Sequence, residues 1–338
     1  MSPPPVGQPT ASVVADGSSS DWWSAGGTDD SGTVALIRTN DNQLPPFALH
    51  VLDPWGVERA RYQSVDASFA EHVFEQRDGF EVIGFDAWAR GVYMAAIDRR
   101  GTVVATATIP GEYAGPTAGD PLGGIRTVLK RIGDDSVIAF AAYDEPLKLR
   151  FRTQLVATGR PVALAVDRQG NSLLLLEGAG PIDGIWIDHS GKAGAEFKAV
   201  EEVPATTSIV LAPRIGSGLF AGRSPGSWTH QFDALGAGSP PPDWLVARPG
   251  STLHLARGGH AYAVVHPLPS GSACGARIEV VTSSGASCGT AVFPTESPWC
   301  HPALAVGRDG TVVEGAVFDG PSAGHRTSVF RWWAGFLK

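Results

Sequence analysis

Residues 160–197 read RPVALAVDRQGNSLLLLEGAGPIDGIWIDHSGKAGAEF and contain four short runs of strand-forming residues. The runs are VALAVD, NSLLLLEG, GIWID and KAGAEF, and Gly, Asp and Ser residues separate them. Short apolar or alternating segments between such turn residues are typical of β-hairpins. Two consecutive hairpins predict one small, four-stranded antiparallel sheet.

The second hairpin of this unit recurs along the chain. Its copies are FALHVLDPWGVERARY (47–62), VYMAAIDRRGTVVATAT (92–108), SWTHQFDALGAGS (227–239) and RIEVVTSSGASCGTAVF (277–293). The residues that open the turns, Asp53, Asp98, Asp188, Asp233 and Thr282, are separated by 45, 90, 45 and 49 residues. The interval of 90 spans two periods, and residues 136–157 supply the missing hairpin with a turn that lacks Asp and Gly. A repeated four-stranded unit predicts a β-propeller, because β-sandwiches lack such a period and β-helix coils are shorter.

The last repeat is incomplete. It begins at HPALAVGRDGTVVEGAVF (301–318) and continues into TSVFRWW (327–333), where the chain nearly ends. We expect ASVVA (11–15) to supply the missing outer strand, since closure of the ring removes exposed sheet edges. The tryptophan pairs 22–23 and 332–333 are expected to pack near this closure. The predicted fold is an all-β propeller of about seven four-stranded blades, closed by an N-terminal strand.

The repeats define the domain organisation. A Pro/Ser/Gly-rich segment, residues 1–26, contains the closing strand and precedes a propeller over residues 27–338. Helices are expected to be scarce, and SFAEHVFEQRDGF (68–80) is the one candidate for a short helix in a connecting loop.

The unit at 160–197 resembles the blades of NHL-type and SBBP-type propeller repeats. In these repeats an AVD-x-x-GN turn joins the inner strands and a D-x-x-G turn joins the outer ones, matched here by 165–171 and 188–191. The resemblance covers one blade well, and the last blade partly, through AVGRDGTV. It implies the fold but no activity, because propellers of this kind bind proteins, RNA or carbohydrates, or catalyse, with few shared site residues.

Composition limits the classes of partner. The chain has 42 Gly and 26 Pro among 338 residues, yet 43% of it is hydrophobic, so a core can form between frequent turns. Its net charge is −8 and no segment concentrates Lys and Arg, so nucleic acid is not expected as a partner. No run of eighteen apolar residues is present, and we expect no membrane span.

The N-terminus bears on localisation. MSPPPVGQPTASVVADGSSS (1–20) is typical of a spacer that follows a removed signal peptide or lipid anchor. We expect a secreted or periplasmic bacterial monomer. A cytoplasmic location stays open, and so does the question of whether Met1 is the native start.

The three cysteines, Cys274, Cys288 and Cys300, fall close together and form no CxxC pair. Three cysteines can form one disulfide and leave one free thiol, and all three possible pairings stay open. The alternative is that all three thiols are reduced. A hairpin centred on residues 283–284 would place Cys288 opposite Glu279 rather than Cys274. Cys300 is therefore expected to pair with one of the other two.

Local motifs for catalysis are weak. GRSPG (222–226) and GPSAG (320–324) match the GxSxG pattern, but they lie between predicted strands and not at a strand-to-helix turn. The nine histidines show no HxH or HExxH spacing. The sequence therefore predicts no cofactor and no local metal motif.

A binding site is expected where the loops between second and third strands and between blades converge on the central channel. Polar and aromatic residues placed in these loops are Asp144, Glu177, Asp183, Asp243, Trp244, His266, Trp299, His301 and His325, joined by Asp120 and Glu145. The tryptophans, with Trp228, could stack on a sugar or a peptide, or could serve as packing anchors.

Three functions fit these features. The favoured one is a non-enzymatic module that binds a protein or a glycan through its loop face. The second is a hydrolase or lyase, with or without a metal, whose site at the channel mouth combines His and acidic residues. The third is a purely structural interaction module. Neither the ligand nor the presence of catalysis follows from the sequence.

Overall fold

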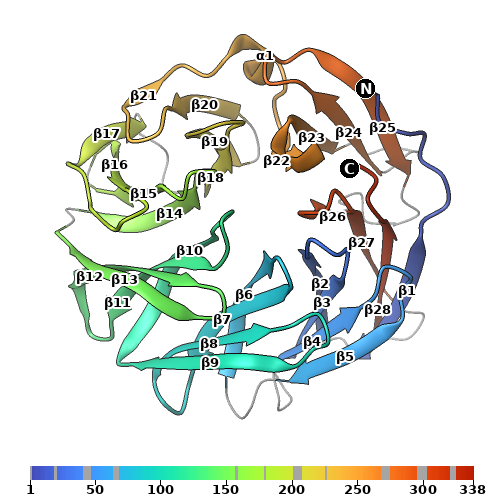
Figure 1. The fold of residues 1–338 in the computed structure, drawn as a ribbon, viewed down its shortest axis with the longest axis horizontal. Coiled ribbons are helices and arrows are strands. Elements are labelled where there is room, and N and C mark those ends of the chain that lie inside the picture. The colour runs from blue at the N-terminus through green and yellow to red at the C-terminus, as the bar shows by residue number, and fades with distance from the viewer. Residues whose placement is uncertain are drawn as a thin grey trace.

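A computed structural model describes most of the chain. The described residues are 2–18, 21–40, 47–63, 68–156, 159–178, 180–200, 208–224, 227–267, 275–294, 303–319 and 325–338. They form seven four-stranded antiparallel sheets arranged in a ring (Figure 1). The all-β, seven-bladed propeller predicted from the repeats is confirmed.

The first three blades follow one another directly along the chain. Blade 1 comprises β2 (Asp21–Thr28), β3 (Val34–Asn40), β4 (Phe47–Leu52) and β5 (Glu58–Gln63). Blade 2 comprises β6 (Ser68–Gln76), β7 (Gly79–Asp86), β8 (Gly91–Ile97) and β9 (Val103–Pro110). Blade 3 comprises β10 (Glu112–Gly119), β11 (Ile125–Arg131), β12 (Asp134–Asp144) and β13 (Lys148–Leu155).

The next three blades keep the same order, with the first strand nearest the channel. Blade 4 comprises β14 (Arg160–Val166), β15 (Ser172–Glu177), β16 (Ile182–Ile187) and β17 (Phe197–Val200). Blade 5 comprises β18 (Ser208–Pro213), β19 (Leu219–Ser224), β20 (Ser227–Phe232) and β21 (Gly238–Ser239). The short helix α1 (Asp243–Val246) then leads to blade 6. Blade 6 comprises β22 (Thr252–Ala256), β23 (Ala261–Pro267), β24 (Gly275–Val281) and β25 (Ser287–Pro294), with a 3-10 turn, η1 (Arg257–Gly259), after β22.

Blade 7 joins the two ends of the chain. It contains β26 (Ala303–Val306), β27 (Val312–Asp319) and β28 (His325–Trp333), and β1 (Ala11–Ser18) is its outer strand. β1 runs antiparallel to β28, with Ala11 opposite Trp332. The predicted closure by residues 11–15 is confirmed.

The core lies between blades. Seven buried apolar clusters each combine side chains from two adjacent blades, including blades 7 and 1. The run LLLL in β15 contributes to two of these clusters. Leu173 and Leu175 pack against blade 5, while Leu174 and Leu176 pack against blade 3. A strand buried on both faces carries a continuous apolar run instead of an alternating one. Each blade therefore needs both of its neighbours.

Of the four tryptophans expected near the closure, Trp23 and Trp332 pack there. Trp332 is fully buried among residues of blades 7 and 1, with Trp23 against the same cluster. Its indole N–H donates to the carbonyl of Pro54, 2.9 Å away. The ring centroid of Trp333 lies 4.8 Å from that of Phe293 in blade 6. The side chain of Trp22 lies outside the described residues.

The recurring aspartate organises the outer turns. In blade 4, Oδ1 of Asp188 accepts the backbone N–H groups of Ser190 and Lys192, both at 2.9 Å. Oδ1 of Asp98 accepts the equivalent N–H groups of Arg100 and Thr102 in blade 2. The carboxylate thus satisfies donors that the turn cannot pair internally, which explains why the motif marks the period.

Two segments differ from the prediction. The helix expected over 68–80 is wrong, because this segment forms β6 and the start of β7. Pairing with β7 and packing between blades override its local helix preference. The segment 110–124, in which Asp120 was expected to lie in a loop, contains the inner strand β10. A register shift between Ala114 and Thr117 accommodates Gly115 and Pro116, so residues that usually interrupt a strand lie in a bulge.

The predicted register around Cys288 is also wrong. Glu279 pairs with Thr290, and a shift between Val280 and Val281 makes Cys288 the extra residue of a bulge. The Cys288 side chain is partly buried, and its thiol is free with respect to the described residues. Cys274 and Cys300 lie outside the described residues, so the disulfide stays a prediction. No described helix is long and apolar enough to span a bilayer.

The closure gives a stability prediction. Deleting residues 2–18 exposes the edge of β28 and opens the cluster between blades 7 and 1, so we expect the melting temperature to fall by roughly 5 °C or more. Val14→Thr is the matched control, because Val14 is 61% exposed and the substitution keeps the strand pairing. An unchanged melting temperature after the deletion would show that β1 does not hold the ring closed.

Candidate functional site

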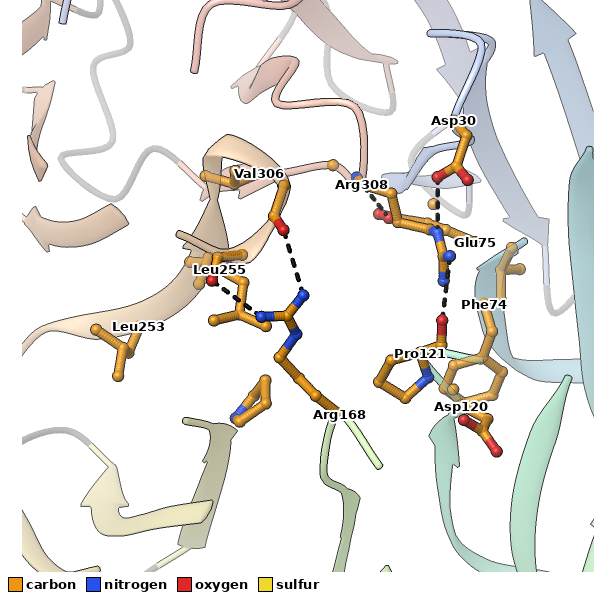
Figure 2. A pocket seen from close by; sticks show the side chains of 18 residues that line it. Asp30, Phe74, Glu75, Asp120, Pro121, Arg168, Leu253, Leu255, Val306 and Arg308 are labelled. Atoms are coloured by element: carbon orange, nitrogen blue, oxygen red, sulfur yellow. Dashed lines mark hydrogen bonds and ion pairs between the residues drawn. The ribbon is translucent and has the colours of Figure 1, made fainter. Parts of the chain in front are cut away.

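A cavity lies at one mouth of the central channel, where the turns between the first and second strands of the blades meet. We call these turns the inner turns and the hollow the inner-turn cavity; its volume is about 540 Å³. Every blade contributes to its wall. Lining residues, in blade order, include Asp30, Glu75, Pro121, Arg168, Pro213, His254 and Arg308 (Figure 2).

Arg168 spans the cavity from blade 4 to blade 6. It follows Asp167 in an inner turn whose Asp accepts the backbone N–H groups of Gln169 and Asn171. The guanidinium donates to the carbonyl oxygens of Gly259 at 3.0 Å and Gly258 at 3.3 Å. A Cβ on Gly259 would lie 2.6 Å from Cζ of Arg168, so the glycine makes room for this approach.

Arg308 makes a second bridge, from blade 7. Its Nε donates to Oδ1 of Asp30 in blade 1 at 2.9 Å, and its Nη2 donates to the carbonyl of Pro121 in blade 3 at 3.4 Å (Figure 2). These contacts stretch the side chain across the mouth and pair its charge with a carboxylate. Arg308 and Arg168 therefore enter the cavity from different blades, one with an acidic partner and one held by carbonyl groups.

Glu75 crosses from blade 2 to blade 7. Its Oε2 accepts the backbone N–H of Arg308 at 3.1 Å, and its carboxylate also accepts the N–H of Thr28 in blade 1. The side chain occupies space that Gly27 leaves open, since a Cβ there would lie 1.9 Å from Oε1. Burial raises the pKa of the Glu75 carboxyl to about 8, although the two N–H groups oppose the shift.

His254 lies on β22, the inner strand of blade 6. Burial lowers the pKa of its imidazole to about 4, so the ring is neutral near pH 7. One ring nitrogen, Nε2, lies 3.4 Å from the hydroxyl of Thr252. Leu253 and Leu255 flank His254, and Phe74 and Val306 add apolar wall from blades 2 and 7. The cavity combines an apolar surface with a few positioned polar groups, as ligand pockets commonly do.

Asp120 reaches this wall but has a structural partner. Its carboxylate and the guanidinium of Arg126 form a fully buried ion pair within blade 3. Removing one partner of such a pair would leave an uncompensated buried charge. Asp120 therefore stabilises the inner turn of blade 3.

The structure places the predicted loop residues at two different ends of the molecule. Asp144 and Glu145 belong to the turn between the third and fourth strands of blade 3, at the same end as the inner turns but not among the cavity lining. Asp144 pairs with Arg150 at 3.7 Å, and Glu145 accepts the backbone N–H of Arg77 at 3.1 Å. Both were expected in loops at the opposite mouth, whereas the structure places them in the turn of the hairpin formed by residues 136–157.

Other predicted residues lie toward the opposite end and are engaged within or between blades. Glu177 pairs with Arg160 at 2.6 Å, and Asp183 pairs with Lys198 at 2.7 Å. His266 is largely buried, with Nε2 at 3.6 Å from Glu279, whose carboxylate binds Arg248 at 2.8 Å. The structure does not gather these side chains into one cluster.

The candidate tryptophans Trp228 and Trp244 are packed between blades 5 and 6. Trp228 is buried, and Trp244 packs on Tyr262 with ring centroids 5.5 Å apart, beside exposed Asp243. Both indoles anchor the linker between blades 5 and 6. Trp299 and His301 lie outside the described residues, and His325 begins β28, where its side chain is not described.

Sequence patterns did not identify Glu75, Arg168, His254 or Arg308 as cavity residues, whereas Asp120 was among the predicted site residues. Arg168 and Arg308 occupy the same position in the repeat, after AVD in AVDRQG and after AVG in AVGRDG. That equivalence was a usable signal, because matching positions in two blades lie at the same height around the channel. Among the described residues, no group of three or more His, Cys, Asp and Glu side chains could hold a metal ion.

Comparisons with known proteins identify the fold alone. No family model and no curated protein matches the sequence. Prolyl oligopeptidase B from Galerina marginata has a similar structure with a TM-score of 0.56 and 8% identity, covering 87% of this chain and 47% of that one. A catalytically inactive virginiamycin B lyase from Staphylococcus aureus, solved with quinupristin, gives a TM-score of 0.52 and 14% identity, covering 94% of this chain and 99% of that one. The chain thus spans about half the length of the oligopeptidase and nearly all of the lyase.

The raised pKa of Glu75 predicts a dependence of stability on pH. The folded state keeps the Glu75 proton up to about pH 8, whereas an ordinary glutamate releases it near pH 4.5. The folded state therefore binds more protons between these values, and the free energy of unfolding falls as pH rises through the window. Glu75→Gln should reduce this fall by about 1–2 kcal/mol, measured by urea unfolding.

Burial also raises the pKa of Glu81 to about 8. The stability of the Glu75→Gln variant should therefore still fall in part as pH rises. At pH 5 the variant and the natural protein should differ least, which provides an internal control. An equal dependence of stability on pH in the two proteins would contradict the assignment of a partly buried, protonated Glu75.

Proposed function

We propose that the protein is a binding module whose ligand occupies the inner-turn cavity. The observation that carries this proposal is a 540 Å³ hollow bounded by all seven blades, with its polar groups fixed by bonds between blades. Positioned side chains lose little conformational entropy when a ligand binds. Protein or glycan recognition by the loops at the opposite mouth is a separate proposal.

A blocking variant tests occupancy of the cavity. Pro121 lines the cavity, and its neighbour Leu122 is 49% exposed and outside the lining. Pro121→Trp should fill the mouth and weaken binding of 1-anilinonaphthalene-8-sulfonate at least about tenfold in a fluorescence titration, because the probe is an apolar aromatic anion that suits the walls. Leu122→Trp, the matched control, should leave the affinity unchanged.

The same titration can contradict the proposed binding site. If the dye does not bind the folded protein, or binds both variants equally, the inner-turn cavity is not the ligand site. Circular dichroism on each variant separates a blocked cavity from a lost fold.

A lyase or hydrolase is the second candidate, favoured by one feature of the cavity. His254 is neutral near pH 7, and the Glu75 carboxyl, with its pKa near 8, can hold a proton there. A neutral imidazole and a protonated carboxyl are suited to general base and general acid roles. The fold similarity to virginiamycin B lyase makes the ligand of that structure, quinupristin, a rational first substrate.

The catalytic candidate predicts loss of intact quinupristin on incubation with the protein, followed by mass spectrometry. His254→Gln should slow that loss roughly 100-fold or more, the usual contribution of a general base. His260→Gln is the control, because His260 is an exposed histidine outside the cavity lining. Turnover that persists in His254→Gln would exclude the imidazole as the base, and absence of turnover with the natural protein would exclude this substrate.

A further inference from the structure

Some charged side chains of the inner-turn cavity form ion pairs and one does not. Arg308 is paired with Asp30, and Asp120 with Arg126. Arg168 has no ion pair among the described residues, and its only partners there are the carbonyl oxygens of Gly258 and Gly259. The cavity wall therefore presents one half-buried positive charge without a counter-ion.

The guanidinium of Arg168 has hydrogen-bonding capacity to spare. It carries five N–H donors. Two are used by the glycine carbonyls, and the others find no acceptor in the described part of the chain. Because those carbonyls fix the plane of the group, the remaining donors are held ready for an acceptor in the cavity. Planar, charged donors of this kind match a carboxylate.

The charged groups around Arg168 favour a ligand with a single negative charge. The carboxylate of Asp30 lines the same cavity, and Glu75 can become a second anion as pH rises. A dianion such as phosphate would meet their repulsion with only one uncompensated cation to offset it. A protonated Glu75, by contrast, can donate a hydrogen bond to a bound monoanion.

Apolar walls adjoin this charge. Leu253 and Leu255 of blade 6 line the cavity together with Val306 of blade 7 and Phe74 of blade 2 (Figure 2). They can bury a hydrophobic group attached to the anion. Burial of that group would add affinity without further polar contacts.

We infer that the inner-turn cavity binds a carboxylate that carries an apolar substituent, with Arg168 as the residue that contacts the carboxylate. This inference rests on the proposed binding function and adds the chemical class of the ligand. Two sources share the chemistry: a small carboxylic acid, and the C-terminus of a peptide that ends in an apolar residue.

A matched pair of compounds tests the inference on the natural protein. N-Acetylphenylalanine carries the carboxylate, and N-acetylphenylalanine amide has the same shape without the charge. Calorimetric titration at low ionic strength and neutral pH should give the acid at least about tenfold higher affinity than the amide, as a charge-assisted hydrogen bond contributes. Added salt should weaken binding of the acid more than binding of the amide.

Variants locate the contact. Arg168→Gln should abolish the preference for the acid, and Arg168→Lys, which keeps the charge without the fork of donors, should retain part of it. Arg160→Gln is the matched control, because Arg160 lies in the same blade, 68% exposed and paired with Glu177, and should leave the preference intact. If Arg168→Gln does not fold, the comparison of acid with amide on the natural protein still decides the question.

The outcomes separate the two proposals. Equal affinity for acid and amide would overturn the carboxylate inference while leaving the binding cavity in place. Binding of neither compound would overturn the inference, and failure of the naphthalene sulfonate to bind as well would overturn the binding function. A preference for the acid that survives in Arg168→Gln would overturn the inference, because a cation other than Arg168 would then bind the carboxylate.

Short peptides distinguish the two sources. A tetrapeptide that ends in phenylalanine, with a free or an amidated C-terminus, is titrated beside N-acetylphenylalanine. Tighter binding of the free peptide supports the inference with a peptide C-terminus as the ligand. Tighter binding of N-acetylphenylalanine supports it with a small acid as the ligand.

Discussion

Antiparallel pairing of β1 with β28 is the interaction on which the rest of the molecule depends. Every apolar cluster among the described residues lies between two blades, so an open ring would leave the last and first blades each with one uncovered face. Closure also positions the cavity, because Arg308 of blade 7 meets Asp30 of blade 1 and the Glu75 carboxylate of blade 2 across that junction. The binding site and the stability of the ring thus rest on the same set of contacts.

The fold was predictable because its signals are local and repeated. The turn at Asp188 is closed by bonds from residues two and four positions along, so the same letters recur wherever the same turn forms. The exceptions depend on how neighbouring strands pair. Residues 68–76 are held as strand by pairing with β7, and the bulge that shifts Cys288 arises within a sheet whose register no local motif specifies.

The candidate site was hardly predictable, for a related reason. Arg168 looks like an ordinary turn residue until the ring places it beside Gly259, and Glu75 lay in a segment expected to be helical. Asp120 was expected in a loop of the binding site, yet it is buried against Arg126. Sequence reasoning selected polar residues from loops, whereas the side chains that line the cavity come from the inner turns and from the inner strands beside them. Their function depends on which blades become neighbours.

The position of β1 in the last blade has a consequence for biosynthesis. A ribosome releases residue 11 long before residue 332, yet Ala11 pairs with Trp332 in the finished ring. The emerging chain must therefore carry an unpaired strand through the synthesis of six blades, and the ring can close only after β28 has been made. Contacts so distant along the chain form slowly, so closure of the ring is expected to be a slow step of folding.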